Sequence, residues 1–321
     1  MNENRNFVIA ILLSAIVLFG WTLLGEQLFP PSKAPATVAA SAGSAGTSGA
    51  PAQAAVAKPR DVKVALAETG RVLVETPKIK GSINLKGARL DDLILPRHTI
   101  SLDKNSGPVR ILSPAGTEHS QFAGFGWTGS GANLPNADTV WATSSAKLTP
   151  QSPIMLSWEN GQGQLFQIKL SVDENYMFSA EQTITNKGAG PVAIRPYGYI
   201  NRSYATLGKS SSLAGPSHDV DSWTIHVGPI ATFDNATNYE VNYPDLDEAG
   251  ANGSRFKSTG GWLGFGDTYW LTALAPTQTA NIDAGFRKDN GTYQADYALD
   301  SVIVAPDQSN TAKTHFFAGA K

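Results

Sequence analysis

The pattern of hydrophobic and polar positions divides the chain into three regions. The first contains an uncharged apolar run, FVIAILLSAIVLFGWTLL, which follows a short polar start. Its eighteen residues would form a helix of about 27 Å, close to the hydrocarbon thickness of a bilayer. The pattern therefore predicts an N-terminal transmembrane anchor over residues 1–29. The residues expected to lie in the membrane include Phe7, Ile11, Leu18, Trp21 and Leu24.

A cleaved signal peptide is the alternative to a retained anchor. Signal peptides have an apolar core of about 7–15 residues, followed closely by small residues at the cleavage site. Here the apolar run is longer, and Glu26, Gln27 and Phe29 follow it, which favours retention. Arg5 lies on the short amino-terminal side of the run and favours an inside amino terminus. We therefore expect the rest of the chain to be exported.

The second region, residues 30–60, consists almost entirely of Ala, Pro, Ser, Gly and Thr. Its apolar content is too small to offset the entropy of ordering, and a flexible chain of this length spans roughly 30 Å. An Ala-rich helix is the competing interpretation, but scattered Gly and Pro residues would interrupt such a helix. The composition predicts a disordered linker.

The third region, residues 61–321, shows short runs in which apolar and polar residues alternate, as in antiparallel β structure. Asn160-Gly161 and Asn290-Gly291 tolerate the positive φ of tight hairpin turns. No repeat of fixed period is present, so a propeller or solenoid is disfavoured. We expect one all-β domain, a large sandwich of two packed sheets. The predicted strands include runs with apolar positions at Val62, Val64 and Leu66, at Phe166, Ile168, Leu170 and Val172, and at Tyr176, Phe178, Ala180 and Ile184.

Composition narrows the range of functions. The formal net charge is −2 and there is no basic run, so nucleic acid is not expected as a partner. The chain has no cysteine, which excludes disulfides, thiolate metal sites and a cysteine nucleophile. With 41% hydrophobic residues, the exported part is expected to be stabilised by packing alone, without a cofactor.

Two short motifs resemble ligand sites but lack essential parts. Gly208-Lys209-Ser210 matches the end of a phosphate-binding loop, yet Ser203 occupies the position of the required earlier glycine, so a turn is favoured. The acidic segment 245–248 contains Asp245, Asp247 and Glu248, as in a calcium loop. The next ligand position is Ala249, which favours a solvated acidic turn.

The histidines do not have the spacing of a metal site. They are His98, His119, His218, His226 and His315, and none forms an HxxxH or HxH pair. Folding could still bring His218 and His226 near Glu240 for acid–base chemistry on a sugar. Packing or surface roles are the favoured interpretation, because catalytic geometry has to be present first.

An aromatic cluster at residues 260–276 contains the sequence GGWLGFGDTYW. Alternation places Trp262 on one strand face, and Leu263 and Phe265 on the other. Core packing is favoured, since aromatic residues bury large apolar areas. The functional alternative is a hydrophobic groove that binds an extended peptide or another protein. The candidate groove or contact residues are Trp223, His226, Trp262, Tyr269 and Trp270.

Four segments together resemble the YidC family of bacterial membrane protein insertases. These are the start NRNFVIAILLSAIVLFGW, the segment SWTIHVGPIATF, the segment GGWLGFGDTYW and the end HFFAGAK. They occur in the family's order: anchor helix, low-complexity linker, large periplasmic domain and last strand. The resemblance implies a periplasmic β-supersandwich, related in fold to galactose mutarotases, on a single N-terminal span in the bacterial inner membrane.

The resemblance also implies a helper role without enzymatic activity. In the family, insertion belongs to five later transmembrane helices, and this sequence is expected to hold only the anchor and the periplasmic domain. The implied partners are the Sec translocon and its accessory subunits, nascent inner-membrane proteins and, through the N-terminal helix, the lipid bilayer. A membrane-tethered carbohydrate-binding or mutarotase-like domain is the alternative, and fold kinship alone suggests it.

Overall fold

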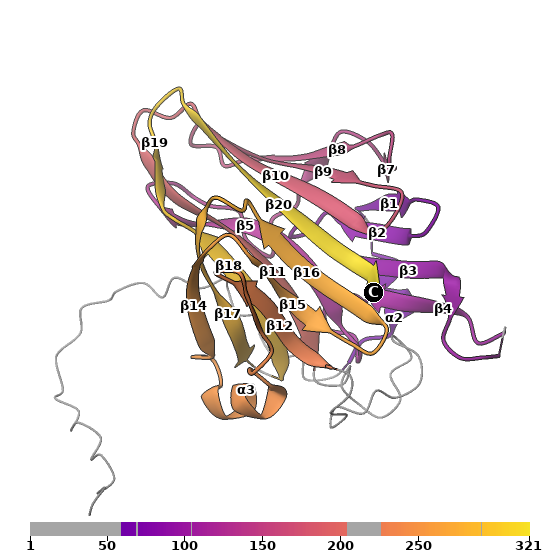
Figure 1. Ribbon diagram of the computed structural model, residues 1–321. Coiled ribbons are helices and arrows are strands. Elements are labelled where there is room, and N and C mark those ends of the chain that lie inside the picture. Colours follow the sequence, from indigo (N-terminus) through magenta and orange to yellow (C-terminus); the bar gives the residue numbers. More distant parts are fainter. Residues whose placement is uncertain (1–58, 69, 104, 204–225, 290) are drawn as a thin grey trace, which may run out of the picture. The chain divides into compact units, whose positions relative to one another are not determined.

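The computed structural model describes residues 59–321, except 69, 104, 204–225 and 290. The described residues form two large β-sheets and two short helices (Figure 1). The predicted anchor and nearly all of the predicted linker lie outside these residues. Of the helices that are described, none is long and apolar enough to cross a membrane.

The first sheet has eleven strands. In spatial order they are β14 (Ser254–Thr259), β17 (Asn281–Asp289), β18 (Thr292–Leu299), β11 (Val192–Ser203), β5 (Gln121–Ser130), β3 (Arg89–Thr99), β2 (Lys80–Asn84), β1 (Arg71–Glu75) and β7 (Lys147–Leu148). Two further strands lie off this path: β19 (Val302–Val304) pairs with β11, and β4 (Pro108–Leu112) pairs with β3. All pairs in this sheet are antiparallel except β1 with β7.

The second sheet has nine strands, all paired antiparallel. In spatial order they are β13 (Ala236–Asn238), β12 (Gly228–Phe233), β15 (Trp262–Gly266), β16 (Trp270–Pro276), β20 (Ser309–Ala320), β10 (Met177–Asn186), β9 (Gln164–Val172), β8 (Ile154–Glu159) and β6 (Ala142–Thr143). The last strand of the chain, β20, lies in the middle of this sheet, between β16 and β10.

One hydrophobic core joins the two sheets. In β9 the alternation expected from the sequence is present, because Phe166, Ile168 and Leu170 are buried while the residues between them are not. Each fully buried side chain of this size stabilises the fold by about 1.5–3 kcal/mol. Aromatic contacts cross between the sheets, as between Phe265 and Phe286, whose ring centroids lie 6.1 Å apart. The expected two-sheet all-β sandwich is thus confirmed.

Buried polar side chains also connect the sheets. Gln182 of β10 is fully buried, and its Nε2 donates to the backbone oxygens of Gly126 (2.7 Å) and Tyr197 (3.3 Å) in the first sheet. The hydroxyls of Tyr297 on β18 and Thr314 on β20 form a second bond between the sheets. Because a buried polar group without a partner is costly, such bonds favour one alignment of the sheets over others.

The strand predicted over residues 62–66 is wrong. Val62–Leu66 forms the short helix α2. The side chain of Asp61 caps this helix, because its Oδ1 accepts hydrogen bonds from the backbone amides of Lys63 (2.8 Å) and Val64 (3.2 Å). Apolar residues at every second position over only five residues do not distinguish a strand from a single helical turn.

The prediction of an acidic turn at 245–248 is also corrected, because this segment belongs to helix α3 (Tyr243–Ala249). A capping box between Asn242 and Asp245 begins the helix. Asp247 accepts hydrogen bonds from Lys288 Nζ (2.7 Å) and the Tyr293 hydroxyl (2.6 Å). Burial alone would raise the pKa of Asp247, but these two bonds lower it below its ordinary value.

Candidate functional site

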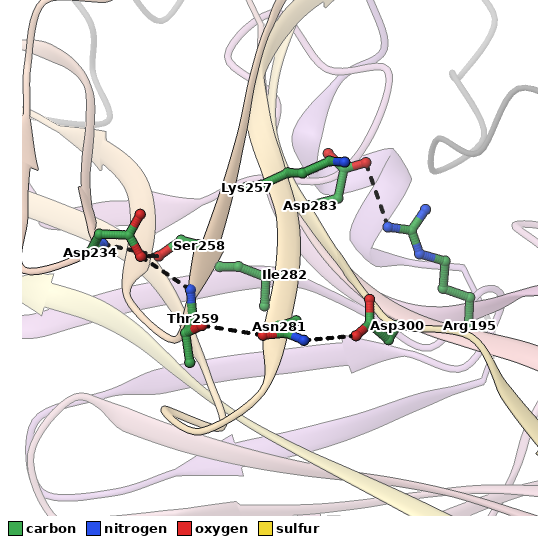
Figure 2. A pocket seen from close by; sticks show the side chains of 9 residues that line it. All are labelled: Arg195, Asp234, Lys257, Ser258, Thr259, Asn281, Ile282, Asp283 and Asp300. Carbon is green, nitrogen blue, oxygen red and sulfur yellow. Dashed lines mark hydrogen bonds and ion pairs between the residues drawn. The ribbon is translucent and has the colours of Figure 1, made fainter.

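A polar cleft of about 510 Å³ lies on the outer face of the first sheet, near its β14 edge (Figure 2). In β17, Ile282 and Ala284 point into the core, so Asn281 and Asp283 point outward. The strand register places these outward residues beside Thr259 and Lys257 of β14, respectively. The cleft is lined by Arg195, Asp234, Lys257, Ser258, Thr259, Asn281, Ile282, Asp283 and Asp300.

A chain of alternating charges runs from the cleft across the sheet. Asp283 accepts hydrogen bonds from Arg255 Nη2 (2.8 Å) and Nε (3.1 Å), and it lies 3.5 Å from Arg195 Nη2. Arg255 Nη1 donates to Asp296 at 2.7 Å. Burial alone would lower the pKa of Arg255, but the two aspartates raise it above its ordinary value. The chain therefore holds its guanidinium and carboxylate groups in fixed positions.

Hydrogen bonds also occupy the opposite wall of the cleft. The Oδ1 of Asp234 accepts from the Ser258 hydroxyl (3.1 Å) and from the Thr259 amide (3.3 Å). The Thr259 hydroxyl donates to Asn281 Oδ1 (3.2 Å), and Asn281 Nδ2 donates to Asp300 (3.1 Å). Figure 2 shows this bonded series running from Asp234 through Thr259 and Asn281 to Asp300.

The arrangement in the cleft suits binding better than catalysis. All three lining carboxylates already accept hydrogen bonds or an ion pair, and no histidine or aromatic ring lines the cleft. A general acid or base needs a proton-transfer group directed at the reacting atom, and no such group stands out here. Across the described part of the chain, no three His, Cys, Asp or Glu side chains are grouped to hold a metal ion.

The structure places Tyr269 and Trp270 in a series of neighbouring rings at the turn of the β15–β16 hairpin. The ring centroids of Tyr269 and Trp270 lie 6.2 Å apart, and those of Trp270 and His98 lie 5.2 Å apart. His98 Nε2 is 3.4 Å from the Tyr176 hydroxyl, and the Tyr176 and Phe317 centroids are 6.0 Å apart. We call these five residues the aromatic rim.

The structure does not bring the other candidate residues into one groove. Trp262 pairs with Thr232 at one end of the β12–β15 ladder, whereas Gly228 pairs with Gly266 at the other end, close to His226. Trp223 lies outside the described residues, so its relation to the others is not addressed. Of the four described candidates, Trp262 thus lies at one end of β15, and His226, Tyr269 and Trp270 lie toward the other.

The described histidines lie in separate environments. His226 Nε2 donates to the Pro229 oxygen (2.8 Å), and its ring faces Tyr239 at 6.2 Å between centroids. His315 Nδ1 lies 2.8 Å from the Ser179 hydroxyl on the exposed face of β20. His119 has a buried Nδ1 without a hydrogen-bond partner. His218 and the Gly208-Lys209-Ser210 motif lie outside the described residues.

Comparison with protein families decides the classification. The family model for the YidC periplasmic domain matches residues 71–321, which covers every described β-strand. The chain belongs to the YidC family. This agrees with the resemblance carried by the anchor, the 260–270 segment and the last strand.

Relatives within the YidC family cover the whole chain. A protein from Zymomonas mobilis named membrane protein insertase YidC is 42% identical over 100% of this chain and 53% of its own length. The protein of the same name from Granulibacter bethesdensis is 36% identical over 100% of this chain and 55% of its own length. The chain therefore spans about half the length of the curated relatives that it matches, and these relatives are named as insertases rather than enzymes.

Among solved structures, a galactose mutarotase-like protein from Lactobacillus casei is similar over 78% of this chain and 100% of its own, with a TM-score of 0.47 and 8% identity. A likeness at this level carries no argument about the activity of this chain.

Sequence reasoning missed the cleft of this YidC domain altogether. Its lining comes from five separated parts of the chain, represented by Arg195, Asp234, Lys257, Asn281 and Asp300. No motif spacing joins them: the strand order β14-β17-β18-β11 makes four of them neighbours, and hydrogen bonds to Ser258 and Thr259 join Asp234 to β14. The sequence offered one indication, the alternation of β17 around the buried Ile282. This alternation predicts which side chains share an outward face of the strand, but it does not predict a binding site.

Proposed function

We propose that this chain is the membrane-anchored periplasmic part of a YidC-type insertase and that it assists the insertion and folding of inner-membrane proteins. The observation that carries the proposal is the match of the periplasmic-domain model over residues 71–321. Relatives named membrane protein insertase, similar over the full length of this chain, support it. The predicted anchor would hold the domain on the periplasmic side of the inner membrane.

In this proposal the domain acts by contact with the Sec translocon, its accessory subunits and nascent membrane proteins. The polar cleft is the candidate contact site for a folded partner, because it combines fixed charges with hydroxyl and amide groups on an outer sheet face. The Nζ of Lys257 forms no ion pair with any carboxylate of the described residues, so it is available to a partner. Trp262 lies near this cleft along the chain, three residues after the lining residue Thr259.

Site-specific photo-cross-linking in intact inner membranes tests the proposal. A photoreactive residue at Lys257 or Thr259 in the cleft should capture translocon components. The matched control is Lys169, which is also exposed and lies in the second sheet, in an ion pair with Glu181. We expect few cross-links from that position. Equal capture from the cleft and from Lys169 would remove the cleft from the contact surface.

A sugar-epimerising activity is the outcome that would replace the proposal. We expect His226→Ala to leave insertion of membrane proteins unchanged, because His226 bonds the nearby Pro229 oxygen, faces the Tyr239 ring and does not line the cleft. We also expect the purified protein to interconvert sugar anomers no faster than buffer does. A clear enzymatic rate that is lost in His226→Ala would establish an enzyme instead.

A further inference from the structure

The aromatic rim has a composition that the polar cleft lacks. Tyr269 is 57% exposed, while Trp270, His98, Tyr176 and Phe317 are partly buried against neighbouring rings. The rim therefore exposes part of its aromatic side chains to solvent, while the remaining apolar area packs against the domain. Amphipathic rings of this kind are enriched where a protein meets the interface of a bilayer.

An exposed apolar side chain lies next to the rim. Leu102 is 103% exposed in the β3–β4 hairpin, four residues after His98. The hairpin is closed below it by the bond from the Ile100 amide to the Gly107 oxygen (3.1 Å). A fully exposed leucine on a projecting turn gains free energy by entering an apolar phase, at about 25 cal/mol for each Å² removed from water.

Positive charges surround the rim. Lys78 Nζ lies 5.2 Å from the centre of the Tyr176 ring, Arg97 adjoins His98 and is exposed, and the Lys321 amide donates to the Tyr269 oxygen (3.0 Å). Within the described residues, none of these three cations forms an ion pair with a carboxylate. Lys78 Nζ donates to the neutral side chain of Asn175 (2.7 Å), and Asp267 acts electrostatically on Lys321, but no carboxylate pairs directly with these cations, so they can pair with anionic groups outside the protein.

Carboxylates near the rim are turned toward their own loops. The Oδ1 of Asp173 accepts from the amides of Asn175 (2.8 Å) and Met177 (3.0 Å). The Oδ1 of Asp103 accepts from the amide of Asn105 (2.9 Å). These acids stabilise turns and do not neutralise the cations by direct pairing.

We propose that the aromatic rim, with Leu102, is a docking surface by which the folded domain itself binds an anionic bilayer. The rings lie at the interface, Leu102 enters the acyl region, and Lys78, Arg97 and Lys321 contact headgroup phosphates. An extended peptide fits this surface less well, because β16, β20 and β10 have partner strands on both sides and offer no free backbone edge.

The predicted anchor and linker make weak docking sufficient. A tether of roughly 30 Å keeps the domain at high effective concentration near the membrane, so modest affinity is enough for high occupancy. This docking does not depend on the insertase assignment, because it needs only the rim and the membrane. The docking experiment can therefore fail while the cross-linking experiment succeeds, and the reverse.

The experiment uses the full chain reconstituted in vesicles of phosphatidylcholine and phosphatidylglycerol. Since the chain has no cysteine, a single Leu102→Cys substitution takes one environment-sensitive fluorophore. The matched control is Ile303→Cys on β19, another exposed apolar position at 72%. β19 and the carboxyl end of β20 lie at opposite sides of Figure 1. We expect nitroxide-labelled lipids to quench the fluorophore at residue 102 and to leave the one at residue 303 bright.

Charge substitutions then test the contribution of the cations. Lys78→Gln and Arg97→Gln should each reduce the ratio of docked to undocked domain about fivefold, the factor for one basic residue at an anionic surface. Lys313→Gln is the control, since Lys313 is exposed on β20 about 26 Å along the strand from Lys321. Equal quenching at residues 102 and 303, or docking unaffected by phosphatidylglycerol and by both substitutions, would overturn the proposal.

Discussion

The hydrogen bond between Tyr297 and Thr314 allows a quantitative test of how the two sheets are joined. Tyr297 is 1% exposed on β18 and Thr314 is 0% exposed on β20. Tyr297→Phe and Thr314→Val each remove one hydroxyl and nearly preserve the shape of the side chain. Each single substitution leaves the other hydroxyl buried without this partner, which should lower the free energy of unfolding by about 1–3 kcal/mol.

The double variant distinguishes this bond from general packing. It removes both hydroxyls, so its cost should be smaller than the sum of the single costs, with a coupling energy of about 1 kcal/mol or more. The assay is urea unfolding, followed by tryptophan fluorescence, of a chain that begins at residue 59. We expect this chain to fold alone as a β-rich domain, because all described strands lie within it.

An exposed hydroxyl pair that also involves β20 provides the control. The hydroxyls of Thr183 on β10 and Thr311 on β20 lie 2.8 Å apart, but on the exposed face of the second sheet. The corresponding valine substitutions should change the free energy of unfolding by only a few tenths of a kcal/mol. If the Tyr297 and Thr314 costs were simply additive, the inferred bond would not exist in the folded protein.

Three further outcomes are expected. Gly198→Ala should destabilise the domain by about 1–3 kcal/mol in urea unfolding, because its Cβ would lie 2.8 Å from a ring atom of Tyr297. The pKa of Asp247 is lowered in the folded protein, so its stabilising effect should be present above pH 3.8 and lost as the pH falls through its folded-state pKa. Asp247→Asn should flatten that part of the curve of unfolding free energy against pH. An unchanged curve would contradict the stabilising role of Asp247. Amino-terminal sequencing of the exported protein should find residues 1–29 still attached, and a mature start after Glu26 would identify a cleaved signal peptide instead.

The sequence predicted strands best where the alternation was long. The nine residues of β9 alternate throughout, and a pattern of that length is not shared with a helix. The five residues of α2 were too few, and the capping side chain of Asp61 decided their structure. Helix α3 had a readable signal, since Asn242 and Asp245 have the spacing of a capping box.

The residues of the candidate site could not be predicted from the sequence, for a different reason. Sequence distance hides which strands become neighbours: the aromatic rim joins His98 to Trp270, and the cleft joins Arg195 to Asp283. The aromatic segment contributes to the core only in part, since Leu263 and Phe265 are 0% and 1% exposed whereas Tyr269 is 57% exposed. Trp262 is separated from the rim because it lies at the end of β15 away from the β15–β16 turn.

The central position of β20 has a consequence for the timing of folding. Its twelve residues come last, yet they pair with β10 more than a hundred residues earlier and with β16 on the other side. Until they emerge during synthesis, both neighbouring strands carry an unpaired edge, which is prone to aggregation. The second sheet can therefore close only after β20 has been synthesised, and its folding should be slow because these contacts are so distant in sequence. A protein proposed to assist the folding of others would itself pass through a vulnerable, strand-deficient intermediate.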